Sequence, residues 1–158
     1  MANITKIIIG SDHAGFEFKR EIVGLLQAKK IDFEDIGNHT KDSSDYPDTA
    51  ILVGEAVSAG RADRGILICG SGVGMSIVAN RFPGVRAALV TDVETARLSR
   101  LHNNSNVLIL GERVLDPQKI PAILSVWLDA EFEGGRHQRR LDKIEALEKQ
   151  LYLHTQKK

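Results

Sequence analysis

The most reactive side chain of the sequence stands at the end of an apolar run. The stretch GILICGSGVGMSIVANR (residues 65–81) contains the chain's only cysteine, Cys69, followed by glycines at positions 70, 72 and 74. A helix is predicted after these glycines, so backbone amides and the positive end of the helix would lie beside the sulfur. Such surroundings favour a thiolate, which acts as a nucleophile or a general base. Residue frequencies alone would make a lone strand cysteine a core residue, but its position at the strand end favours the reactive role.

The glycines that follow Cys69 predict a site for a small anion. Gly70, Gly72 and Gly74 carry no Cβ, so a ligand can approach the backbone closely. The loop matches neither nucleotide motif: a P-loop needs Gly-Lys before Ser or Thr, and a dinucleotide fingerprint reads G-x-G-x-x-G, usually after the first strand. A phosphate, a carboxylate or an enediolate fits the loop better. A nucleotide-binding or regulatory module, indifferent to loss of Cys69, is the non-enzyme alternative.

Other polar residues follow the predicted strands at the same edge of the sheet. Asp12 and His13 follow the first strand, and Arg113 follows the fifth. Ligands of open α/β sheets bind beyond the carboxyl ends of the strands, so these residues are candidate ligand contacts. A loop cap with a surface imidazole is the structural alternative for Asp12 and His13. The edge therefore combines a carboxylate, an imidazole, a thiol and a guanidinium.

Two further groups lie elsewhere in the sequence. His102 and Asn103 precede the fifth strand, at the amino end of the sheet. They form either a helix-capping loop or a part of the site that a second subunit supplies. Arg136 and Arg140 are one helical turn apart at the start of a helix, where the dipole disfavours cations. A bound phosphate would explain them, because guanidinium groups match its oxygens.

The predicted elements alternate between strand and helix along the chain. Five short apolar runs predict strands, at residues 6–11, 32–37, 64–69, 86–90 and 106–110. Segments with helical period separate them, which predicts an α/β fold with a five-stranded parallel sheet between two layers of helices. The chain is expected to form one domain, residues 1–158, with residues 151–158 as a frayed tail.

The last predicted helix carries an apolar stripe of its own. Leu141, Ile144, Leu147 and Leu151 fall on one face. The pattern is equally compatible with packing on the chain's own sheet and with packing on a partner subunit.

Composition excludes several classes of protein. Lys plus Arg and Asp plus Glu both number 21 in 158 residues, so the formal net charge is zero and a general electrostatic affinity for nucleic acid is not expected. We expect no membrane association, because no apolar run approaches the roughly 20 residues of a membrane span and the N-terminus does not resemble a signal peptide. One cysteine cannot form an intrachain disulfide, which favours the cytoplasm. No cluster of residues has metal-ligand spacing, and neither a metal nor an organic cofactor is expected.

Five motifs together resemble the sugar-phosphate isomerase family that includes ribose-5-phosphate isomerase B and the allose-6-phosphate and galactose-6-phosphate isomerases. The matching segments, which span nearly the whole chain, are GSDHAG, SDYPD, ILICGSGVGMSIVANR, LSRLHNNSNVLILGERV and EGGRHQRR. The resemblance implies a Rossmann-like fold and a homodimer, or a dimer of dimers, whose active sites lie between subunits. It also implies that the C-terminal helix takes part in dimerisation. The implied reaction interconverts D-ribose 5-phosphate and D-ribulose 5-phosphate, a step of the non-oxidative pentose phosphate pathway.

The resemblance also implies a role for each matched residue. Cys69 would be the base that moves a proton between C2 and C1, and His102 would open the sugar ring, with Asp12 and Ser71 assisting. The remaining residues would bind the substrate. The enediolate would lie on the backbone amides of Gly70, Ser71, Gly72, Val73 and Gly74. The phosphate would contact His13, Arg113, Arg136 and Arg140, and the sugar would contact Asn103 and Tyr46.

The sequence departs from parts of the family at two points. One branch uses a glutamate further along the glycine loop and lacks the cysteine. Here residues 73–76 read Val-Gly-Met-Ser, without a carboxylate, so the chain resembles the cysteine users. Ser71 replaces the threonine of many relatives and keeps the hydroxyl. Preference for a six-carbon sugar phosphate remains the enzymatic alternative.

Overall fold

The computed structural model describes residues 6–155 and has a five-stranded, all-parallel sheet at its centre. The strands are β1 (Ile7–Ser11), β2 (Phe33–Asp35), β3 (Arg64–Cys69), β4 (Ala87–Leu89) and β5 (Val107–Gly111). All five occur where the sequence predicts strands. β1, β3 and β5 are buried along their whole length, as near-continuous apolar runs require in a parallel sheet covered on both faces.

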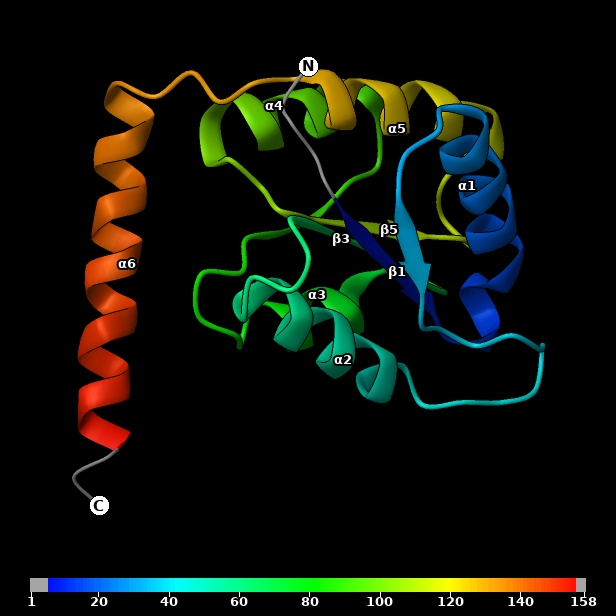
Figure 1. Cartoon of the computed structure of the whole chain (residues 1–158), viewed down its shortest axis with the longest axis horizontal. Coiled ribbons are helices and arrows are strands. Elements are labelled where there is room, and N and C mark those ends of the chain that lie inside the picture. The colour runs from blue at the N-terminus through cyan, green and yellow to red at the C-terminus, as the bar shows by residue number, and fades with distance from the viewer. Residues whose placement is uncertain (1–5, 156–158) are drawn as a thin grey trace.

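Helices cover the two faces of the sheet in separate layers (Figure 1). The helices α1 (Phe16–Ala28), α4 (Val93–Asn103) and α5 (Ile120–Asp129) pack on one face, and α2 (Tyr46–Ser58) and α3 (Val73–Ala79) pack on the other. Two short 3₁₀ turns, η1 (His13–Gly15) and η2 (Pro117–Lys119), precede α1 and α5. The expected Rossmann-like, three-layer α/β fold is confirmed.

The strand order locates the natural ligand site of this sheet. The order is β2-β1-β3-β5-β4, so the chain leaves β1 toward one edge to form β2 and then crosses back to form β3 on its other side. The switch point therefore lies between β1 and β3. Register aligns the ends of the central strands, because Ser11 pairs with Ile68 and Cys69 pairs with Gly111. Residues that follow these three strands must meet at one edge.

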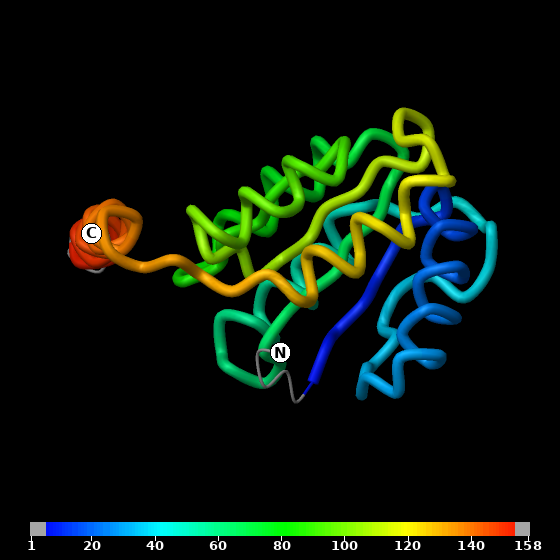
Figure 2. Tube along the Cα trace, turned by 90° about the horizontal axis from the view of Figure 1, so that it is seen from above, coloured from blue at the N-terminus to red at the C-terminus, as the bar shows by residue number. Residues whose placement is uncertain are grey.

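The last helix, α6 (Arg136–Thr155), does not pack on the sheet of its own chain. It stands beside the sheet and its helices in Figure 1, and Figure 2 shows it end-on, joined to the rest by an extended link. Leu141 is buried, but Ile144, Leu147 and Leu151 are 46%, 53% and 60% exposed. Of the two packing arrangements compatible with the stripe, the one on the chain's own sheet is therefore not observed.

The described part of the C-terminus is more regular than expected. Helix α6 continues to Thr155, so the segment predicted to fray from residue 151 is helical over residues 151–155. Residues 156–158 lie outside the described part of the chain. The helix continues because residues 136–155 contain neither glycine nor proline.

Within residues 6–155, no helix combines the length and the apolar character that crossing a membrane requires.

Candidate active site

A cavity of about 410 Å³ opens at the carboxyl ends of the central strands. It lies where the strand order predicts a ligand site. The end of β3, the segments that follow β1, β3 and β5, and the first turns of α2 and α3 meet there. Together they line the cavity: Asp12, His13, Ala14, Tyr46, Cys69, Gly70, Ser71, Gly74, Arg113 and Val114. Eight of these ten are residues that the sequence or the resemblance singles out; Ala14 and Val114 are not.

Cys69 is the last residue of β3 and reaches the cavity from the core. The residue is only 5% exposed, and its sulfur accepts a hydrogen bond from the backbone N–H of Gly72 at 3.1 Å. Gly72 has φ +79°, a left-handed conformation that turns its amide back toward the sulfur and that glycine adopts without strain. The loop thus supplies a donor to the Cys69 sulfur, and the cavity gives a small ligand access to that sulfur.

Two other features of the loop follow from its shape. The N–H of Val73 has an acceptor within the loop, the Ser71 hydroxyl oxygen at 3.3 Å. Gly74 lies directly against the ring of Tyr46: a Cβ at this position would be 2.5 Å from Tyr46 Cζ. The absence of a side chain at Gly74 therefore allows the tyrosine ring to lie over the loop and line the cavity.

We expect Gly74→Ala to displace Tyr46 without unfolding the protein. The ring is 40% exposed and can swing outward, so the new methyl group is accommodated at the cost of the tyrosine's position. Steady-state kinetics should show KM raised about 5-fold, which corresponds to roughly 1 kcal/mol of lost contact. Gly24→Ala is the matched control, because Gly24 lies within α1 and a Cβ added there would meet nothing within 4 Å. An unchanged KM in Gly74→Ala would contradict a substrate contact by Tyr46.

The end of β1 carries both a cap and a candidate ligand group. Asp12 is the N-cap of η1, and its Oδ1 accepts hydrogen bonds from the amides of Ala14 and Gly15 at 2.9 and 3.0 Å. His13 is held by Ser44 from a distant loop, since its Nδ1 lies 3.2 Å from both the amide nitrogen and the carbonyl oxygen of that residue. Asp12 therefore does serve as a loop cap, yet both residues line the cavity. With Nδ1 engaged, Nε2 is the His13 nitrogen left for a ligand.

Arg113 completes the cationic side of the cavity. Its backbone N–H donates to the carbonyl of Gly70 at 2.9 Å, which ties the turn after β5 to the glycine loop. The side chain packs over Gly70, where a Cβ would be 3.3 Å from Arg113 Nε. An imidazole and a guanidinium thus lie at the edge of the cavity that holds the thiol, a combination suited to a phosphate or another small dianion.

Six predicted site residues do not line this cavity. Gly72 and Val73 belong to the loop but are not part of the cavity wall. The other four lie in two remote elements: His102 and Asn103 end α4, and Arg136 and Arg140 begin α6. Along β5 alone, the amino and carboxyl ends of the sheet are about 13 Å apart. Within one protomer the structure therefore separates His102 from Cys69, as its position in the sequence predicts.

The end of α4 that carries His102 is firmly held. Asn104 caps it in a left-handed conformation, and its side-chain oxygen accepts a hydrogen bond from Arg100 Nη1 at 2.9 Å. Arg100 is buried, and burial together with the nearby Arg64 and Arg86 lowers its pKa to about 10. Ser105, just beyond, accepts a hydrogen bond from Trp127 Nε1 at 2.9 Å. These contacts fix the backbone at which His102 is attached.

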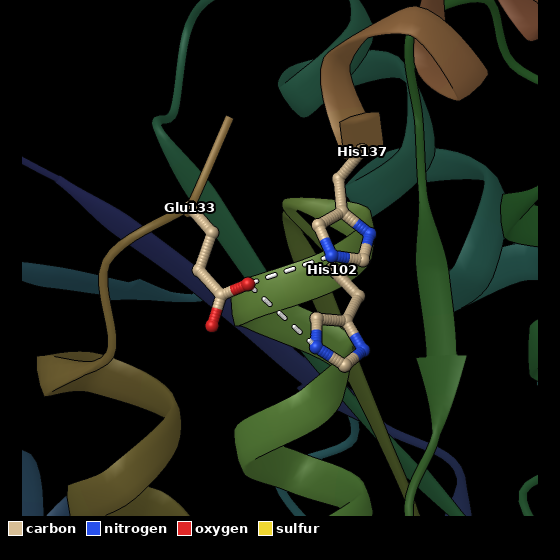
Figure 3. Close-up of side chains that lie close together, drawn as sticks. All are labelled: His102, Glu133 and His137. Carbon is tan, nitrogen blue, oxygen red and sulfur yellow. Dashed lines mark ion pairs between the residues drawn. The ribbon is translucent and has the colours of Figure 1, made fainter. Parts of the chain in front are cut away.

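His102 also belongs to a cluster that sequence reasoning missed. Its ring stacks on that of His137, with centroids 4.2 Å apart and planes within 5°, and Glu133 faces both rings (Figure 3). Burial, followed by electrostatic repulsion from His102 and Arg136, lowers the pKa of His137 from its ordinary value. Glu133 and His137 lie more than 30 positions beyond His102 in the chain, and only their place in the EGGRH segment could have pointed to them.

Comparison with known proteins places this geometry in a family. The family model described as Ribose/Galactose Isomerase matches residues 7–144. The chain belongs to this family. It is 46% identical to ribose-5-phosphate isomerase B of Escherichia coli over 143 residues, which cover 90% of this chain and 96% of that protein.

Solved structures of ribose/galactose isomerases have the same fold. The ribose-5-phosphate isomerase B of Clostridium thermocellum is 50% identical, with a TM-score of 0.90 over 92% of this chain and 99% of that one. The enzyme of Mycoplasma genitalium, solved with bound ribulose-5-phosphate, is 46% identical, with a TM-score of 0.87 over 91% and 96% of the two chains. The likeness therefore extends over nearly the whole of each chain.

Proposed function

We propose that this chain is a ribose-5-phosphate isomerase, which interconverts D-ribose 5-phosphate and D-ribulose 5-phosphate through an enediolate. The observation that carries the proposal is the position of Cys69, a thiol on a cavity that also presents His13 and Arg113. Family membership and the ribulose-5-phosphate bound to the Mycoplasma genitalium relative support it. The exchange of an aldose for a ketose is redox-neutral overall, and the protein groups proposed here supply its acids and bases.

The first step opens the furanose ring. In its protonated form, His102 of the partner subunit donates a proton to the ring oxygen O4 while the C1–O4 bond breaks and its electron pair passes to O4. The C1 hydroxyl loses its proton to the Asp12 carboxylate as the aldehyde forms. One Asp12 oxygen is occupied by the amides of η1, which holds the carboxylate in place at the cavity.

The second step moves a proton between carbons. The Cys69 thiolate takes the proton from C2, and the electron pair forms the C1–C2 double bond with negative charge on O1. The O2 proton passes to O1 by way of the Ser71 hydroxyl, and Cys69 returns its proton to C1, which leaves the carbonyl at C2. Since the amides of Gly72 and Val73 have acceptors within the loop, we assign the enediolate charge to the amides of Gly70, Ser71 and Gly74.

Substrate binding requires a second copy of the chain. His13 and Arg113 of one subunit would bind the phosphate together with Arg136 and Arg140 of its partner, whose Asn103 would contact the sugar. The exposed apolar residues of α6 and the cavity of about 420 Å³ between α6 and residues 83–86 support a partner surface there. We propose a homodimer, or a dimer of such dimers, in the cytoplasm.

Turnover of two substrates tests the proposal. Ketose formation by the purified protein is measured on ribose 5-phosphate and on allose 6-phosphate, without added metal or cofactor. We expect the pentose to be preferred. A strong preference for the hexose would be consistent with the same mechanism but would identify a six-carbon sugar phosphate as the substrate. Turnover of neither sugar would contradict the proposal and would favour the alternative in which the glycine loop binds a nucleotide.

A further inference from the structure

The cluster of His102, Glu133 and His137 brings three polar side chains together from separate elements. His102 lies in the last turn of α4, Glu133 in the link before α6, and His137 at the second residue of α6. The link is tied to α4, because the Glu133 N–H donates to the carbonyl of Leu101 at 3.0 Å. Glu133 Oε2 lies 3.8 Å from His102 Nε2 and 3.4 Å from His137 Nε2 (Figure 3).

The donor atoms are close enough to suggest a metal ion, but the rings have the wrong orientation for one. All three donors lie within 4.8 Å of one another. The lone pair of an imidazole nitrogen lies in the plane of its ring, and a metal such as Zn²⁺ binds along it at about 2.0–2.1 Å. Rings stacked 4.2 Å apart and within 5° of parallel direct their lone pairs side by side rather than at one ion. Arg136, whose Nε donates to His137 Nε2 at 3.3 Å, also disfavours a cation.

The same geometry suits a cluster in which only one of the two imidazole rings is positively charged at a time. Two stacked imidazolium rings repel each other, so the rings do not both hold a positive charge. His137 is 3% exposed, and burial disfavours a positive charge on its ring, while the His102 side chain is 33% exposed and can reach a ligand. When the His102 ring is protonated, the Glu133 carboxylate is its ion-pair partner, and the buried ring of His137 is a flat support beneath it.

We propose that Glu133 is a positioning residue for His102. Its carboxylate holds the His102 imidazole, stacked on the ring of His137, in the orientation that ring opening requires. The inference rests on the proposed function, in which His102 gives its proton to O4 as the C1–O4 bond breaks. Glu133 itself does not touch the sugar in this arrangement. His137 links the cluster to Arg136, so the same stack also orients one of the proposed phosphate ligands.

Glu133→Gln tests the inference, with the kinetic isotope effect as the decisive readout. Glutamine keeps the size of the side chain and removes its charge. We expect kcat on ribose 5-phosphate to fall about 10-fold to 100-fold, as partial loss of an acid catalyst requires, with KM within about 2-fold. Ribose 5-phosphate deuterated at C2 should show an isotope effect on kcat no larger than in the wild type, because ring opening precedes breakage of the C2–H bond.

Two variants serve as controls. Glu131→Gln removes the same charge from the same link and should retain wild-type kcat. Glu133→Asp keeps the charge and should restore part of the lost rate. An unchanged kcat in Glu133→Gln would overturn the inference, as would a raised KM alone. An isotope effect larger than that of the wild type would also overturn it, since the defect would then lie at proton abstraction by Cys69.

Failure of the inference is distinguishable from failure of the proposed function. If the wild type turns over ribose 5-phosphate and Cys69→Ala does not, the proposed function stands whatever Glu133→Gln shows. If the wild type is inactive on sugar phosphates, the proposed function fails, and the positioning role of Glu133 fails with it.

Discussion

Cys69→Ala should abolish ribose 5-phosphate turnover and leave the protein folded. Loss of a general base costs on the order of 10²-fold to 10⁴-fold in rate, and no second thiol exists in the chain to replace it. The fold should tolerate the change, because only one sulfur atom and the hydrogen bond from the Gly72 amide are lost. That loss is worth about 1 kcal/mol, or roughly 2–4 °C in Tm for a chain of this size. A coupled assay for the ketose and a thermal melt measure the two effects.

Cys69→Ser is the matched control for this prediction. Its hydroxyl can still accept the Gly72 N–H, so the loop keeps its shape, but a hydroxyl is a far weaker base than a thiolate at neutral pH. Both variants should be inactive and should still bind ribose 5-phosphate by calorimetry. Turnover within 10-fold of the wild type in either variant would contradict the role of Cys69 as the base. Cys69 would then be a buried hydrophobic residue, which its 5% exposure also allows.

Two inactive variants should restore activity when they are mixed. Cys69→Ala and His102→Ala each remove one group of the proposed catalytic pair, and the structure places those groups at opposite ends of the sheet. If the active site lies between subunits, a mixed dimer holds one site with both groups intact and one site with neither. Random exchange of subunits gives half mixed dimers, each with one of its two sites working. The mixture should therefore recover about a quarter of wild-type activity.

The recovery has to depend on exchange between subunits. Denaturing the two variants mildly and refolding them together should give the full recovery of activity. When the native proteins are mixed at high concentration, activity should recover only as fast as the dimers exchange subunits. Combining both substitutions in one chain is the control: refolded with itself, that double variant should stay inactive. No recovery in the mixture, with refolded wild type active, would contradict the assignment of Cys69 and His102 to different subunits.

The sequence by itself was sufficient for the sheet and for most of the cavity. The runs that became β1, β3 and β5 are apolar at nearly every position, a pattern typical of strands covered on both faces. Parallel strands bring their carboxyl ends to one edge, so Asp12, His13, Cys69 and Arg113 could be placed together without knowledge of their contacts. The separation of His102 from Cys69 followed from the same rule, because His102 precedes a strand rather than follows one.

Only the tertiary structure decided how these groups are held. Ser44 positions His13 from 31 residues away, and Glu133 and His137 reach His102 from a similar distance along the chain. The exposed stripe of α6 was ambiguous for a related reason, since its period shows which residues share a face but not what covers that face. Periodicity and strand ends are local properties, so they can be recognised from the sequence alone. Contacts between distant segments depend on loop paths and packing, which arise only when the whole chain has folded.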